Sequence, residues 1–280
     1  MKAERELISM LSLVDDPDVG WVIKEQLIER GEEAIAAIAA IRNKLSEIDV
    51  DIVDSLVVEL RESVVMAELK TVLELPELSL NRVLFLLTKL ADPDCDENLW
   101  NGILEDFVID LSMEISADKT DVENVDIFNY LFFTRFRFGY DDSEIKHEDC
   151  ALINRSLTSR KGNSVAISMI YFLLSGGVGL PIYPLCFSGG FIPAYLDNRG
   201  DVMFYLNVFN RGSIFDKESL KDILKEMEPD GIQKAIGHER DLAAIYVEML
   251  IFLYRNVQNF NKMSIFEKAK MLISGEKRYL

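Results

Sequence analysis

Apolar residues recur at helical spacing through the first quarter of the chain. From Glu4 to Glu74 they return every three or four residues, as in Leu7, Leu11 and Val14, which is the period of an amphipathic helix. Polar turns interrupt this pattern, and the first is the Asp-Asp-Pro-Asp run at residues 15–18. Because aspartate can cap a following helix and proline is tolerated in its first turn, the pattern predicts a series of short helices.

The first 78 residues are therefore predicted to form a helical module. The order helix, turn, helix, glycine, helix is typical of a HEAT-like helical pair. A solenoid would need several stacked repeats, and the sequence contains only one convincing unit. We expect an appended module over residues 1–78.

Helical periodicity resumes after Pro76. Helices are expected over residues 80–90, 99–115 and 125–138, with a sharp turn at the Ala-Asp-Pro-Asp run of residues 91–94, because the residue before a proline is restricted. The last of these helices carries a string of aromatic side chains. Aromatic residues at this density more often fill a core than line a cofactor site.

The pattern changes after Gly139. An uninterrupted apolar helix is expected over residues 164–175, followed by strands over residues 181–187, 191–196 and 203–208. Asn198 and Gly200 lie between the last two strands and suit the positive φ of a hairpin loop. A buried helix followed by an antiparallel meander predicts an α+β core domain over residues 79–225. Helical spacing then returns, so we expect a C-terminal helical pair over residues 226–280.

Composition narrows the choice of partners and location. With 49% hydrophobic and 28% charged residues, the chain can bury enough apolar surface to fold. Its formal net charge of -18 disfavours nucleic acid and anionic membranes, and no apolar run approaches the roughly 20 residues that span a bilayer. Three widely spaced cysteines and an N-terminus without a signal-peptide pattern favour a reducing compartment. We expect a cytoplasmic protein that binds neither nucleic acid nor membranes.

Few residues could hold a metal or a cofactor. The chain has two histidines, His147 and His238, and it lacks HExxH or CxxC spacing. The glycine-rich run at residues 175–179 follows a helix instead of linking a strand to one, so it does not match a phosphate-binding loop. We therefore expect no metal site and no cofactor.

Four segments in the second half of the chain resemble a known family. They cover residues 152–171, 179–183, 187–195 and 205–212, and they include the runs Arg-Lys-Gly-Asn-Ser, Gly-Leu-Pro-Ile-Tyr, Ser-Gly-Gly-Phe and Asn-Val-Phe-Asn-Arg-Gly. In this order they resemble the SirB-type transglutaminase-like family, a branch of the transglutaminase-like superfamily. The resemblance implies a papain-like or transglutaminase-like core, and the helical segments at both ends look like those of longer family members.

The resemblance also implies positions for a catalytic triad. In the superfamily, a cysteine at the start of a buried helix is the nucleophile, a strand histidine is its base, and an aspartate or asparagine on the next strand orients that histidine. These positions correspond to Ser164, Gly190 and Asn207. Gly190 has no side chain, and Ser164 is better explained as a helix N-cap. Val208 stands where the family favours proline, so the chain departs from the family pattern there as well.

The expected function is therefore binding rather than catalysis. The vacated cleft is the first place to look for a bound protein segment, peptide or small acyl-bearing ligand. Its candidate residues are Asn163, Ser164, Cys186, Phe191, Asn207, Asn210 and Arg211. Arg211 is expected to pin the corner after the strand of Asn207 by pairing with a carboxylate. The alternative is a cysteine or serine acyl hydrolase or transferase whose machinery has moved to Cys186 or Cys150, with His147 as the base.

Overall fold

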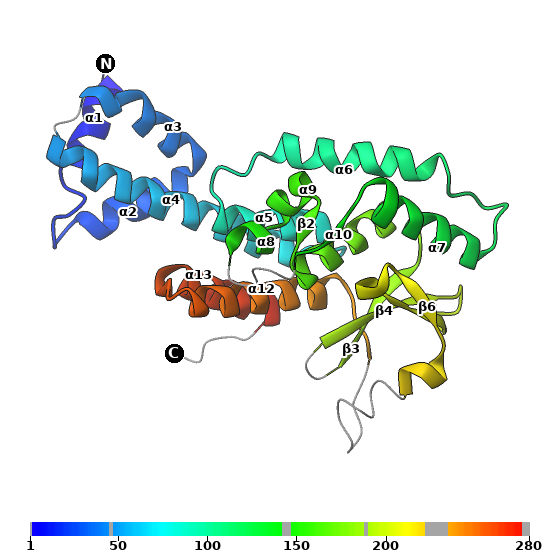
Figure 1. The fold of residues 1–280 in the computed structure, drawn as a ribbon. Coiled ribbons are helices and arrows are strands. Elements are labelled where there is room, and N and C mark those ends of the chain that lie inside the picture. The colour runs from blue at the N-terminus through cyan, green and yellow to red at the C-terminus, as the bar shows by residue number, and fades with distance from the viewer. Residues whose placement is uncertain (1, 45–46, 142–146, 188–189, 222–234, 276–280) are drawn as a thin grey trace. The chain divides into compact units, whose positions relative to one another are not determined.

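A computed structural model describes residues 2–44, 47–141, 147–187, 190–221 and 235–275 of the chain. The chain divides into two compact units, Met1–Glu74 and Leu75–Leu280 (Figure 1). The division predicted from the sequence, with boundaries after residues 78 and 225, stays a prediction.

The first unit consists of helices around a shared apolar core. Its elements are α1 (Lys2–Leu11), α2 (Gly20–Arg30), α3 (Glu32–Ile41), a 3-10 helix (Arg42–Lys44) and α4 (Glu47–Leu73). The apolar positions that recur in the sequence are the buried ones, including Leu7, Leu11, Val14, Leu27, Ile38 and Leu60. Before α2, the Asp16 carboxylate accepts hydrogen bonds from the backbone N–H groups of Asp18 (2.9 Å) and Val19 (3.2 Å). The aspartate turn therefore ends one helix and leads into the next, as predicted.

The second unit combines helices with two sheets. Its helices are α5 (Leu80–Ala91), α6 (Glu97–Ser112), α7 (Asp121–Asn129), a π-helix (Tyr130–Arg135), α8 (Glu148–Ala151), α9 (Ile153–Ser159), α10 (Ser164–Gly177), a 3-10 helix (Val208–Asn210), α12 (Glu239–Asn256) and α13 (Phe260–Ser274). Its strands are β1 (Gly139–Tyr140), β2 (Lys161–Gly162), β3 (Ile182–Phe187), β4 (Gly190–Leu196), β5 (Val202–Asn207), β6 (Ser213–Phe215) and β7 (Ala235–Ile236). The predicted α+β class is confirmed.

The helix expected over residues 125–138 has different ends and a different pitch. It begins at Asp121, because Thr120 and Glu123 form a capping box, with the Thr120 N–H donating to the Glu123 carboxylate at 2.8 Å. From Tyr130 it widens into a π-helix, and the Phe136 N–H donates to the Leu131 carbonyl at 2.8 Å. Such wide turns often occur at functional sites, and periodicity in the sequence does not reveal them.

The larger sheet has the order β6-β5-β4-β3-β7, and every neighbouring pair is antiparallel. Strands β3, β4 and β5 follow one another as the predicted meander. Opposite residues share a face of the sheet, and Tyr183 opposes Ala194 while Leu185 opposes Ile192. This face carries an apolar cluster together with Leu220, which follows β6. The opposite face carries Phe191, whose ring lies 5.9 Å from that of Phe172 in α10.

The loop between β4 and β5 follows the prediction in part. Gly200 has a φ of 82°, as expected for a hairpin loop. Asn198 does not adopt a positive φ, so that expectation is wrong. The Asp197 carboxylate accepts hydrogen bonds from the N–H groups of Arg199 (2.8 Å) and Asp201 (2.9 Å), so the aspartate closes the turn and glycine alone supplies the left-handed residue.

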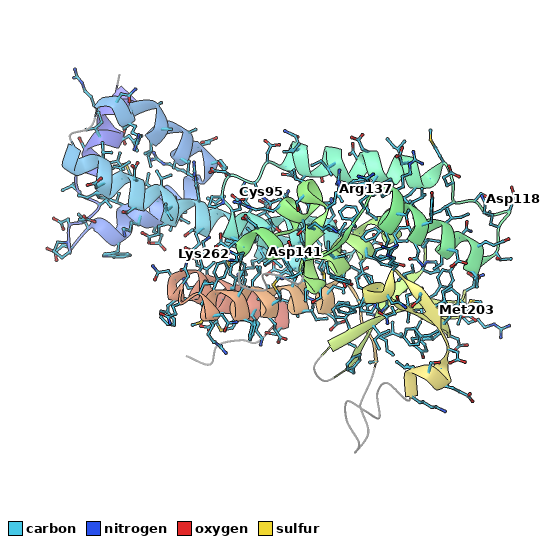
Figure 2. All side chains as sticks on the ribbon, viewed as in Figure 1. Cys95, Asp118, Arg137, Asp141, Met203 and Lys262 are labelled. Carbon is cyan, nitrogen blue, oxygen red and sulfur yellow. The ribbon has the colours of Figure 1, made fainter. Side chains whose placement is uncertain are left out.

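Helix α10 is the centre of the second unit. It contacts α6, α8, α9, α12, β2 and β3, and most of its residues are buried. Figure 1 shows α12 and α13 side by side. Lys262 of α13, labelled in Figure 2, donates hydrogen bonds to the Ala91 carbonyl (2.9 Å) and the Glu148 carboxylate (2.8 Å). These contacts tie the C-terminal helices to α5 and α8.

Candidate functional site

The start of α10 is held by Asn163. Its side-chain oxygen accepts a hydrogen bond from the Ala166 N–H at 2.9 Å, and its backbone N–H donates to the Cys150 carbonyl at 2.6 Å. Asn163 is therefore the N-cap, and Ser164 is the first helical residue. The prediction that Ser164 caps the helix is wrong by one position, because Asn163 has the extended backbone that a cap requires.

The Ser164 hydroxyl lacks the partner that a nucleophile needs. It is half-buried and forms no hydrogen bond with any residue in the described part of the chain. An unassisted hydroxyl is a poor nucleophile at neutral pH, and an adjacent base is what normally activates it. His147 directly precedes α8, a helix that contacts α10, and its side chain is exposed.

Gly190 lies at the first position of β4, opposite Phe187. Alternation along the strands puts this pair on the face that carries Leu185 and Ala194, away from the face where Phe191 meets α10. A side chain at position 190 would begin with a Cβ whose nearest described neighbours are atoms of the Phe187 ring, at 3.3 and 3.4 Å. The structure therefore does not direct this position toward Ser164.

Asn207 organises the corner that follows β5. Its side chain accepts a hydrogen bond from the Asn210 N–H at 3.1 Å, and its carbonyl accepts one from the Gly212 N–H at 2.8 Å. Asn210 also donates to the Ser213 hydroxyl at 3.2 Å. Arg211 is exposed, has a φ of 50° and forms no ion pair with the described residues. The prediction that Arg211 pins this corner through a carboxylate is wrong for the part of the chain that the structure describes.

Asn129, which was not predicted, anchors the corner instead. This buried side chain, at the end of α7, donates to the Gly212 carbonyl at 2.8 Å and accepts from the Tyr171 hydroxyl at 2.7 Å. A Cβ on Gly212, which has a φ of 74°, would lie 2.0 Å from the Asn129 oxygen. The sequence does contain a signal, because a lone asparagine within an aromatic helical stretch has no local reason to be there.

The same corner approaches the start of α10. The Phe209 ring stacks on Tyr140 with centroids 4.9 Å apart, and Tyr140 pairs with Gly162 in the small parallel sheet. Gly162 lies two residues before Ser164. The structure thus brings the Asn207 corner and the Ser164 end of α10 to the same small sheet, whereas Gly190 faces away.

Cys95 and Cys186 are held as neutral thiols. Burial, with a smaller contribution from Asp241, raises the pKa of Cys186 to about 11. Burial, followed by the negative charge of Asp92, likewise raises the pKa of Cys95 to about 11. Cys150 is buried and forms no disulfide within the described residues. Reactive cysteines usually lie in electropositive surroundings that lower the thiol pKa, so the environments of Cys95 and Cys186 are the opposite of what catalysis needs.

Two large pockets lie elsewhere in the second unit. One, of about 780 Å³, lies among α6, the end of α10, the start of β3 and the start of α12. The other, of about 740 Å³, lies between the α5–α6 turn and α8–α9. Arg155 lines the second pocket and pairs with Asp92 (3.2 Å) and Asp149 (2.7 Å). Ser164, Gly190 and Asn207 line neither pocket.

In the described ranges, no group of three or more His, Cys, Asp or Glu side chains is arranged to hold a metal ion. Among the helices described, none is both long and apolar enough to cross a membrane.

Comparison with known proteins gives two matches. The family model described as "Transglutaminase-like superfamily" matches residues 99–245. UPF0162 protein BU173 of Buchnera aphidicola subsp. Acyrthosiphon pisum (strain APS) is 28% identical over 162 residues, which are 56% of this chain and 55% of that protein. The chain thus spans about half the length of this curated relative. No solved structure matches.

Proposed function

The chain belongs to the transglutaminase-like superfamily, and from this premise we propose that it is a non-catalytic, SirB-type member that acts by binding a protein or peptide. The observation that carries the proposal is Gly190. The position that corresponds to the catalytic base has no side chain, and it faces Phe187 instead of α10. General base catalysis typically contributes about 10²- to 10⁴-fold to rate, and this position has no group to supply it.

The surroundings of the possible nucleophiles support the same reading. The Ser164 hydroxyl has no hydrogen-bonded base among the described residues. Cys186 has a pKa raised to about 11, so its thiolate is scarce at neutral pH. The Asn207 side chain accepts a hydrogen bond from the Asn210 N–H in its own corner. It therefore has a structural role at the position where other superfamily members orient a histidine.

The binding role draws on three parts of the chain. The cleft proposed for a ligand comprises Asn163, Ser164, Cys186, Phe191, Asn207, Asn210 and Arg211. The helical module of residues 1–78 and the helical pair of residues 226–280 would add protein-binding surface, in a cytoplasmic setting.

Labelling of the intact native protein tests the absence of catalysis. The protein, its Ser164→Ala variant and its Cys186→Ala variant are treated at neutral pH with a fluorophosphonate probe and with iodoacetamide, and labelled residues are mapped by mass spectrometry. We expect no stoichiometric fluorophosphonate labelling. Because burial raises the pKa of Cys186 to about 11, its thiolate is scarcer at neutral pH, and its alkylation should be about tenfold slower than that of an ordinary thiol.

The pH dependence gives this experiment a second readout. Since only the thiolate reacts, the alkylation rate of native Cys186 should keep rising up to about pH 11, whereas in denatured protein it should level off near pH 9, the reference value. The alternative, an acyl hydrolase or transferase that uses Cys186, Cys150 or Ser164 with His147, predicts rapid labelling of one residue. Rapid labelling of Ser164 or Cys186 that disappears in the matching variant, or rapid labelling mapped to Cys150, would refute the proposal.

A further inference from the structure

The pocket of about 780 Å³ has a predominantly apolar wall. It lies where α10 ends, and it is called here the α10-end pocket. Its apolar lining includes Leu104, Val108, Ile109, Phe172, Ile182 and Leu242. Ile109 is 57% exposed, so it adds apolar surface that solvent and a ligand can reach. The volume lies within the range of ligand-binding pockets, about 300 to 1,000 Å³.

The charges around this pocket are negative. Glu105 of α6 and Glu239 of α12 line it, and neither forms an ion pair with any described residue. Its described lining contains no lysine or arginine. The C-terminal end of α10 also reaches the pocket through Gly176 and Gly177. Its Ser175 and Gly176 carbonyls accept hydrogen bonds from the Leu180 and Gly179 N–H groups, so the two glutamates are the main source of negative charge. A cation is therefore favoured here and an anion is disfavoured.

Glycines keep the mouth of the pocket open. A Cβ on Gly176 or Gly179 would meet no heavy atom within 4 Å, so space beside the main chain is free at both positions. Gly177 differs, because a Cβ there would lie 2.7 Å from Val108. Where side chains are missing, the main chain of a ligand can approach closely. His238, at the far side, packs edge-on against Tyr183 with ring centroids 6.3 Å apart.

We propose that the α10-end pocket binds a peptide segment that carries apolar side chains and a lysine or arginine. The apolar wall takes the aliphatic side chains, and Glu105 and Glu239 attract the cation. This inference deepens the proposed binding role and rests on it, since it names a binding site and the chemistry of the partner. The pocket is separate from the degenerate triad positions, so it adds a location that the superfamily resemblance does not imply.

Filling the pocket is the first test. Binding of a fluorescein-labelled leucine–lysine peptide to the intact protein is followed by fluorescence anisotropy at physiological ionic strength. Gly176→Leu adds a side chain in open space within a helix, where leucine is favoured over glycine. We expect affinity to fall at least about tenfold, because the ligand loses apolar contact area.

The matched control is Gly102→Leu. Gly102 is also a helical glycine whose Cβ would meet no atom within 4 Å, but it does not line this pocket. The Gly102→Leu variant should bind the peptide with the same affinity as the wild-type protein. Equal weakening in both variants, or no weakening in Gly176→Leu, would overturn the proposed site, as would failure of the peptide to bind the wild-type protein.

Charge is tested separately. A counterpart peptide with glutamate in place of each lysine should bind at least about tenfold more weakly. Glu105→Gln should lower the affinity for the lysine peptide about threefold. Glu114→Gln, at an exposed position outside the pocket, should leave this affinity unchanged. Equal binding of the two peptides would overturn the cationic partner. Self-association that Gly176→Leu abolishes would make a second copy of the chain the occupant and would also overturn the proposal.

These outcomes are distinct from failure of the proposed function. Labelling of a nucleophile would show that the protein is catalytic, without altering peptide affinity at the α10-end pocket. Failure of the peptide to bind in the α10-end pocket would not change the conclusion that Gly190 supplies no catalytic base. The two experiments therefore fail independently.

Discussion

Asn129 joins two parts of the candidate site that are far apart in the sequence. It bonds to Tyr171 of α10 and to the carbonyl of Gly212 beyond β5. Both hydrogen bonds are buried. Loss of one partner is costly there, because the remaining polar group cannot form a replacement hydrogen bond with water. The close approach also requires glycine at position 212, where a Cβ would overlap the Asn129 side chain.

We predict that Asn129→Ala destabilises the protein. The change leaves the Tyr171 hydroxyl and the Gly212 carbonyl without their buried partner, so the free energy of unfolding should fall by about 2 to 4 kcal/mol. Urea denaturation followed by circular dichroism measures the loss. Asn210→Ala, at an exposed position of the same corner, serves as the control and should change stability by no more than about 0.5 kcal/mol. Equal effects of the two changes would show that Asn129 does not anchor the corner.

The start of α10 carries Ser164, the position that corresponds to the catalytic nucleophile. Asn163 caps the helix, and Gly162 before it has a Cβ position only 2.3 Å from the Ser156 hydroxyl oxygen. A side chain at position 162 would displace the Ser156 hydroxyl and crowd the Cys150 carbonyl oxygen, which would lie 3.1 Å from its Cβ. The element is therefore positioned by its cap and by close backbone packing, and Ser164 takes part in neither.

We predict different stability effects for the two neighbouring polar residues. Asn163→Ala removes the cap and should reduce the free energy of unfolding by about 1 kcal/mol. Ser164→Ala removes a hydroxyl without a described hydrogen-bond partner and should change stability by less than about 0.5 kcal/mol. Chemical denaturation of both variants makes the comparison. If Ser164→Ala were the more destabilising change, Ser164 would be part of the cap after all.

The whole molecule consists of two units, each with its own apolar core. The first unit buries Leu27, Ile38 and Leu60, and the second is organised around α10. The segment between α4 and α5 is exposed, and Leu75 is 53% exposed. A chain that folds as two cooperative units is most open to proteolysis at such a connection.

We predict that a glutamate-specific protease under native conditions cleaves first after Glu74 or Glu77. The helices on either side hold their backbone in hydrogen bonds, whereas this exposed segment does not continue either helix. Mass spectrometry identifies the fragments, and circular dichroism of the purified fragments should show that both retain helical structure. First cleavage inside α4 or α5 would contradict the division into two units.

Local pattern accounts for much of this protein. Helical spacing and strand signals in the sequence predicted most helices and the β3–β5 meander, because each depends on which face of its own segment is apolar. The four similar segments also led to the transglutaminase-like superfamily, which the family match confirms. These features require only neighbours in the sequence.

Tertiary structure alone decided the rest. The face on which Gly190 lies depends on strand register, and a shift of one residue would reverse it. Asn129 gains its role because Tyr171 and Gly212 approach it from distant parts of the chain. The α10-end pocket likewise forms from α6, α10, β3 and α12, and no single segment contains it. Sequence by itself determined the elements and the family, whereas packing between distant segments determined which side chains meet, because that depends on long-range contacts that local periodicity does not specify.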